Sequence, residues 1–78
     1  MTDRLTQLFA VVFDLEVDQL NDESNPDTVE KWDSLAAMQL VAEIEETFNV
    51  QLKTTEIMMM DSIGRARQVL KRKGVEGI

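Results

Sequence analysis

Ser34 is the side chain in this sequence whose type and position best suit covalent chemistry. It follows Asp33 and precedes a segment with helical apolar spacing, so it lies at the predicted start of a helix. The simplest interpretation is that the two residues only cap that helix. A second interpretation is that the free N–H groups and positive dipole of the helix start favour an anion, such as a phosphodiester on the hydroxyl. Because no base neighbours Ser34, another enzyme would have to activate it.

The absence of cysteine and histidine removes most other chemistry. Without them the chain has no disulfides, no thiolate or imidazole metal ligands and no histidine base for a nucleophile. All three glycines lie at position 64 or beyond, so there is no glycine-rich phosphate loop. The adjacent Glu45 and Glu46 point about 100° apart on a helix, which indicates a solvated face rather than an acid–base pair. We therefore expect a protein that is not an enzyme and has no dedicated metal site.

An imperfect calcium-loop pattern begins at Asp14 and continues with Glu16 and Asp18. The sixth position of such a loop should be Gly and the twelfth Glu, whereas this chain has Gln19 and Asn25. The pattern therefore fails, and we expect only weak, non-specific binding of divalent cations to the acidic surface.

The charge is strongly acidic and unevenly distributed. Fifteen acidic and eight basic residues give a net charge of −7, which argues against binding to nucleic acid or to anionic membranes. Five of the eight bases fall within residues 62–78. No apolar run is long enough to span a membrane, and the start Met1-Thr2-Asp3-Arg4 does not resemble a signal peptide. These features predict a monomeric cytoplasmic protein that meets basic patches on its partners.

Apolar periodicity predicts an all-α fold. A first helix is expected over residues 3–16 with Thr2 as its N-cap, followed by a long loop over 17–33 that is rich in Asp, Asn and Ser. A second helix is expected from residue 34 or 35 to residue 48 or 49. The large apolar residues of the loop are expected to pin it to the core, and they are Leu20, Val29 and Trp32.

Two further helices complete the prediction. A short one is expected around residues 55–60, capped by Thr54 or Thr55, with Glu56 favoured by the helix dipole. The last begins after Asp61-Ser62 and ends at Gly74. Its inward residues are predicted to be Ile63, Ala66, Val69 and Leu70. The sequence therefore predicts a four-helix bundle, with three main helices and one short helix, in a single domain over residues 1–78.

The run from Asp33 to Phe48 resembles the Asp-Ser-Leu helix of acyl carrier proteins and peptidyl carrier domains. The similarity extends over essentially the whole chain: its length, its acidity, the long first loop and the Asp61-Ser62-Ile63 start of the last helix. Many fatty-acid carriers have a glycine shortly before Asp-Ser-Leu, whereas this chain has Glu30-Lys31-Trp32. It is therefore more similar to stand-alone carriers of specialised pathways or to D-alanyl carrier proteins.

This resemblance implies a bacterial carrier with 4′-phosphopantetheine attached to Ser34. A separate phosphopantetheinyl transferase would supply the group from coenzyme A, and the arm would carry acyl, aminoacyl or polyketide groups as thioesters. The implied partners are this transferase and the enzymes that load and accept acyl groups. The residues implied to contact partners are Asp33, Leu35, Met38, Glu45 and Glu46. Peripheral core packing of Leu35 and Met38, and plain solvation of the two glutamates, remain alternatives.

The resemblance also implies an apolar crevice that shelters the cargo between the second helix and the segment before the last one. Its candidate residues are Ile44, Met58, Met60 and Ala66, since methionine side chains can move aside without a fixed cavity. The alternative is that all four are plain core. Two rival functions stay open: an unmodified protein of the same fold that acts as an adaptor or regulator, and an acidic cation-binding protein.

Overall fold

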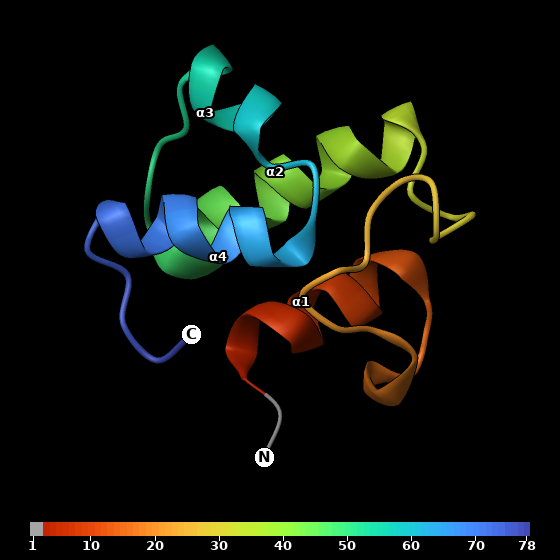
Figure 1. Ribbon diagram of the computed structural model, residues 1–78. Helices are drawn as coiled ribbons and strands as arrows, with labels where there is room; N and C mark the ends of the chain where they lie inside the picture. Colours follow the sequence, from red (N-terminus) through yellow and green to blue (C-terminus); the bar gives the residue numbers. More distant parts are fainter. Residues whose placement is uncertain (1–2) are drawn as a thin grey trace.

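The computed structural model describes residues 3–78 and confirms the all-α fold (Figure 1). Among these residues there are no strands. The elements are α1 (Arg4–Phe13), the single 3-10 turn η1 (Val17–Gln19), α2 (Ser34–Phe48), α3 (Thr54–Met59) and α4 (Ile63–Arg72). Three helices of ten or more residues and one of six match the predicted set.

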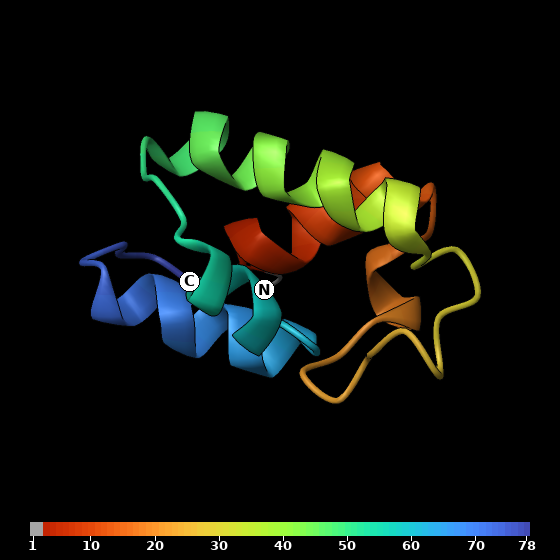
Figure 2. The same cartoon turned by 90° about the horizontal axis from the view of Figure 1, so that it is seen from above.

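Helix α1 lies between α2 and α4, which form opposite sides of the bundle (Figure 2). The short α3 packs against α4, and the long loop lies at the end of the bundle where α2 begins. The core is closed by aliphatic and aromatic side chains from α1, α2, α4 and the loop, together with Met60 just after α3. Its fully buried large members are Leu5, Phe9, Phe13, Leu40, Ile44, Ile63 and Leu70.

Helix α1 is shorter than the predicted range of 3–16. Thr2, the predicted cap, lies outside the described residues, and the structure places Asp3 at the N-cap. The helix stops at Phe13 because Asp14 adopts the left-handed conformation, with φ at 55°. Asp tolerates that conformation better than most residues, so the helix can end at this position. The prediction was too long because the apolar spacing in the sequence continues beyond this turn of the backbone.

The prediction that Thr54 or Thr55 caps α3 is wrong. Lys53 occupies the N-cap, and its backbone N–H donates to Glu56 Oε1 at 2.8 Å. This hydrogen bond, and a second one from the Lys73 ammonium, lower the pKa of Glu56. Both threonines lie inside the first turn, because the glutamate side chain folds back and satisfies the start of the helix instead.

Helix α4 follows its prediction closely. The Ser62 hydroxyl accepts the N–H of Arg65 at 3.1 Å as the N-cap, and Gly74 has a positive φ of 89° just beyond the helix. The four residues predicted to face inward are all buried. The capping serine and the glycine after the helix were therefore enough to predict where α4 begins and ends.

Trp32 anchors the long loop to the core, as predicted together with Leu20 and Val29, and all three are buried. The Trp32 ring lies 5.3 Å from that of Phe9 and 5.2 Å from that of Phe13, between ring centroids. Aromatic pairs at such distances add stability beyond their buried area. Since Trp32 comes two residues before α2, this cluster also sets where that helix begins.

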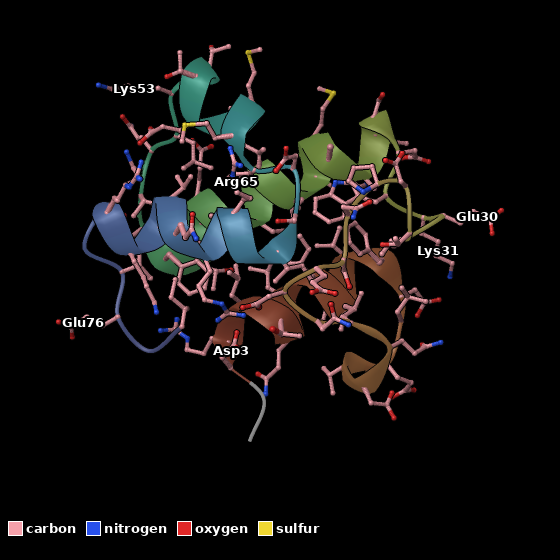
Figure 3. All side chains as sticks on the ribbon, in the orientation of Figure 1. Asp3, Glu30, Lys31, Lys53, Arg65 and Glu76 are labelled. Carbon is pink, nitrogen blue, oxygen red and sulfur yellow. The ribbon has the colours of Figure 1, made fainter. Side chains whose placement is uncertain are left out.

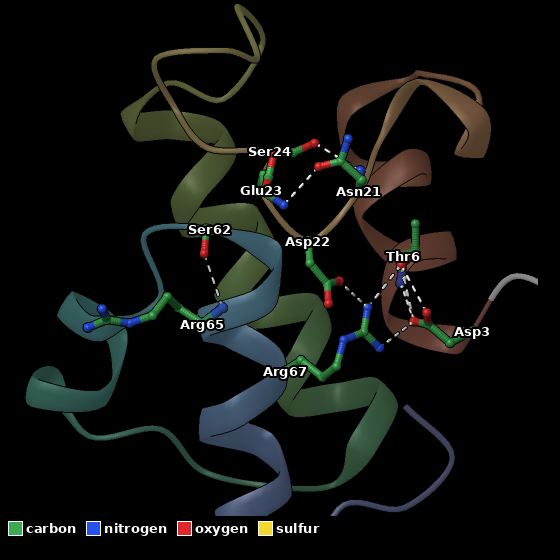
Figure 4. Close-up of polar contacts among 9 residues, drawn as sticks. All are labelled: Asp3, Thr6, Asn21, Asp22, Glu23, Ser24, Ser62, Arg65 and Arg67. Carbon is green, nitrogen blue, oxygen red and sulfur yellow. Dashed lines mark hydrogen bonds and ion pairs between the residues drawn. The ribbon is translucent and has the colours of Figure 1, made fainter.

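Arg67 ties the other end of the loop to α1 and α4 (Figure 4). Its guanidinium lies 3.1 Å from Asp3 Oδ1 and 2.8 Å from Asp22 Oδ1, and it donates to the Thr6 hydroxyl at 3.3 Å. Only 14% of the Arg67 side chain is exposed. Partial burial alone would raise the pKa of Asp3, but the hydrogen bonds from Arg67 and Thr6 and the charge of Arg67 outweigh it and lower that pKa.

The lowered pKa of Asp3 predicts a loss of stability in acid. Its folded pKa lies below the unfolded value of about 3.9, so its contribution is present above that pH and is lost as the pH falls through the folded pKa. Asp3→Asn should keep the N-cap and remove the charge. We expect urea unfolding to show a deficit of about 1 kcal/mol at pH 7 that shrinks toward pH 3. A deficit that stays constant over this range would contradict a role for the Asp3 charge.

Candidate functional site

Ser34 is the first residue of α2 and is exposed. Figure 2 shows the junction of the long loop with the start of this helix. Its neighbour Asp33 is the N-cap, and Asp33 Oδ1 accepts the N–H of Ala36 at 2.8 Å. The Ser34 hydroxyl is not needed for capping and has no hydrogen-bond partner among residues 3–78. Asp33 therefore caps the helix, and the Ser34 hydroxyl remains available for modification.

The backbone around Ser34 is open to an anion. The N–H groups of Ser34 and Leu35 have no acceptor among the residues that the structure describes, and they lie at the positive end of a helix of 15 residues. No side chain within this part of the chain hydrogen-bonds the hydroxyl, and histidine is absent from the sequence. The site suits a serine that receives an anionic group from another enzyme.

The start of α4 contrasts with that of α2. There the N–H of Ile63 donates to the carbonyl of Ser24 at 3.1 Å, and the N–H of Gly64 donates to the carbonyl of Asp22 at 2.9 Å. A Cβ at Gly64 would lie 3.0 Å from that Asp22 oxygen, so glycine permits the close approach of the loop. Loop carbonyls thus accept the first N–H groups of α4, whereas no residue among 3–78 accepts those of Ser34 and Leu35 in α2.

Two apolar side chains stand out on the surface next to Ser34. Leu35 is 67% exposed and Met38 is 71% exposed, so neither is the peripheral core residue that one interpretation of the sequence suggested. Met58 of α3 is 75% exposed as well. Large apolar side chains that remain in water near a candidate site favour a surface that meets a partner.

The two glutamates predicted to face partners differ in their surroundings. Glu46 is exposed and has no partner among residues 3–78. Glu45 is half-buried, and its Oε2 accepts the N–H of Leu52 at 2.9 Å. Glu45 therefore holds the segment after α2 against that helix, a role that its sequence position did not indicate.

The four predicted crevice residues do not line one open space. Ile44, Met60 and Ala66 are buried in the core, whereas Met58 points into solvent. An apolar hollow of about 300 Å³ does exist between α2 and α3, and its walls are Ala37, Met38, Val41 and Ile57. Ala37 and Val41 share the helical spacing of the buried residues Leu40 and Ile44. The hollow thus lies in the region where the resemblance implied a crevice, but residues other than the four predicted ones line it.

The cations of the last helix are largely engaged with acids of the same chain. Besides Arg67, Lys73 Nζ lies 3.0 Å from Glu56 Oε1, and Arg65 Nε lies 3.8 Å from Asp61 Oδ1. Lys73 and Arg67 are the more buried of these cations. Lys73 links the end of α4 to α3, and Arg67 links α4 to the start of α1. The basic end of the sequence thus serves the fold through these pairs.

Residues 3–78 contain neither a membrane-spanning helix nor a cluster of metal ligands. Every helix in this range is too short or too polar to cross a lipid bilayer. Groups of three or more Asp or Glu side chains arranged to hold a metal ion do not occur in the same range.

Comparison with known proteins yields one family. The family model described as "Phosphopantetheine attachment site" matches residues 3–70, which include α1 to α3 and most of α4. No curated protein is significantly similar to the sequence. The exposed Ser34 hydroxyl and the two open N–H groups beside it fit a covalently attached phosphodiester.

Proposed function

Because this chain belongs to the phosphopantetheine attachment site family, we propose that it is a non-catalytic carrier whose Ser34 holds 4′-phosphopantetheine. The observation that supports Ser34 most directly is its unbonded, exposed hydroxyl at a helix start with two free N–H groups. A monoanionic phosphodiester there would gain from the helix dipole. The group supplies a terminal thiol for thioester chemistry, and the chain itself contains no cysteine.

The attachment requires a transferase, because the chain offers no base to Ser34. In the transfer, the Ser34 oxygen forms a bond to the phosphorus of coenzyme A that carries the pantetheine. The pyrophosphate bond breaks, adenosine 3′,5′-bisphosphate leaves, and the hydroxyl proton passes to the transferase. The role of Ser34 is to present an unhindered oxygen on a rigid helix end, which α2 and the Trp32 anchor hold in place.

The cargo is proposed to be an acyl, aminoacyl or polyketide group. The hollow between α2 and α3 supports this proposal, because its four walls are apolar and it lies beside the first half of α2. A volume of about 300 Å³ lies at the lower end of the range for small-molecule pockets. Met38 and Ile57 can change rotamer to widen it, since both lie at its exposed edge.

The exposed surface around Ser34 is proposed to contact the transferase and the enzymes that load or accept acyl groups. Leu35 and Met38 would supply an apolar contact of the kind that salt does not weaken. Glu46 and the Asp33 carboxylate add negative charge on α2 that would steer a basic patch toward the serine. Glu45 contributes less to docking, because its carboxylate is bonded to Leu52.

Intact-mass spectrometry tests the proposal. The full chain is incubated with coenzyme A and a broad-specificity phosphopantetheinyl transferase, and the expected result is a gain of one phosphopantetheine group. A chain that remains unmodified with several such transferases would instead support the rival function, an adaptor that is never modified.

The docking proposal predicts a salt-dependent rate. Glu46→Lys should slow transfer of the arm by up to about fivefold at low salt, since exposed ion pairs contribute about 0–1 kcal/mol. The difference should diminish at ionic strengths where the Debye length falls below about 10 Å. The control is Gln68→Lys, which adds an exposed positive charge on α4, the helix on the opposite side of the bundle from α2. Equal rates for Glu46→Lys and wild type at low salt would contradict steering by Glu46.

A further inference from the structure

A second hollow is lined by the two residues that flank Ser34, Asp33 and Leu35, and involves another face of α2 than the apolar hollow. It has a volume of about 300 Å³ and lies between the end of α1 and the first half of α2. The residues that matter here are Val12 and Asp14 from the end of α1, Lys31 and Asp33 from the loop, and Leu35 and Gln39 from α2. We call this space the Lys31 groove. Asp33 and Leu35 flank Ser34 in the sequence, so the groove opens directly beside the attachment point.

Lys31 is a loosely held cation in this groove. Its Nζ lies 4.0 Å from Asp14 Oδ2 and 3.5 Å from the Asp14 carbonyl, and half of its side chain is exposed. Figure 3 shows Lys31 on the loop before α2, at the side of the bundle where α1 ends. Contacts at the limit of ion-pair distance to a fully exposed carboxylate are weak. Lys31 is therefore free to pair with a stronger anion.

The chemistry of the groove differs from that of the apolar hollow. The hollow between α2 and α3 has only apolar walls, which suits a hydrocarbon cargo. The Lys31 groove combines an ammonium, a side-chain amide and two aliphatic side chains. A phosphopantetheine arm presents an anionic phosphodiester, a branched aliphatic segment and two amides in that order from the serine, and so offers a complement to each kind of group.

We propose that the Lys31 groove holds the unloaded phosphopantetheine arm, with Lys31 paired to its phosphodiester. This inference rests on the proposed attachment to Ser34. The carboxylates of Asp14 and Asp33 also line the groove and oppose the phosphodiester, so Lys31 and the open N–H groups of α2 must offset them. The aliphatic segment of the arm would lie against Val12 and Leu35, and its amides would reach Gln39. A loaded arm could instead send its acyl group to the apolar hollow between α2 and α3.

Nuclear magnetic resonance of the modified full chain tests this proposal. Each sample is first checked by intact mass for one attached group. In the wild type we expect nuclear Overhauser effects from the geminal methyls of the unloaded arm to the methyls of Val12 and Leu35. Lys31→Gln should weaken them at least twofold, because the phosphodiester loses its cation. Lys53→Gln is the matched control: it removes the same charge at an exposed position that does not line the groove.

The outcomes separate the two proposals. Effects from the unloaded arm to Met38 and Ile57, or to no side chain at all, would overturn the Lys31 groove as its resting place. Equal weakening in Lys31→Gln and Lys53→Gln would overturn the pairing with Lys31. A wild-type chain that gains no mass would overturn the proposed function itself, and the arm's resting place with it.

Discussion

Replacing Ser34 with alanine is expected to abolish the mass gain completely, because in the proposed transfer the Ser34 hydroxyl oxygen is the atom that bonds to phosphorus. The change should leave the fold intact. Asp33 remains the N-cap, and alanine is a better helix former than serine, so the free energy of unfolding should move by no more than about 0.5 kcal/mol. Circular dichroism under increasing urea checks this, and intact mass after incubation with the transferase checks the modification.

The two other serines of the chain provide matched controls. Ser24 is buried, and its hydroxyl accepts the N–H of Asn21 at 3.0 Å. Ser62 caps α4 by accepting the N–H of Arg65, so its replacement costs about 1 kcal/mol without touching the site. Ser62→Ala should therefore still gain one group. Modification of Ser34→Ala, or loss of modification in a folded Ser62→Ala chain, would contradict the assignment.

Replacing Trp32 with alanine is expected to cause the largest loss of stability, about 3–5 kcal/mol for removal of a buried aromatic side chain. The ring is 6% exposed and contacts both Phe9 and Phe13, so its removal leaves a cavity between α1 and the loop. A domain of this size has a total stability of roughly 4–12 kcal/mol. The variant should therefore unfold at much lower urea concentrations.

The measurement is urea unfolding followed by circular dichroism, since the variant lacks the single tryptophan. Trp32→Phe should lose less, because a second ring still fills part of the space. Val11→Ala removes an apolar side chain that is 80% exposed and should change stability by less than about 0.5 kcal/mol. A loss for Trp32→Ala as small as that for Val11→Ala would show that the aromatic cluster does not anchor the loop.

The sequence by itself determined the number and order of the helices and indicated Ser34 as the candidate attachment residue. Helix α2 begins and ends where apolar spacing and the Asp33 cap predict, and α4 has the predicted cap and buried face. These features depend on contacts within a turn or two of the chain, so short-range patterns suffice. The apolar residues of the loop were equally predictable, because Trp32 is too large and apolar to remain in water.

Tertiary structure alone decided what surrounds the serine. Periodicity shows which face of a helix turns inward but not which neighbour covers each position. Ala37 and Val41 therefore line an open hollow, while Ile44 lies on the same stripe and is closed over. Lys31 borders the end of α1 only because the loop folds back to a residue 17 positions earlier. Arg67 meets Thr6 across 61 positions. Such contacts follow from how the helices pack together, and no local pattern encodes them.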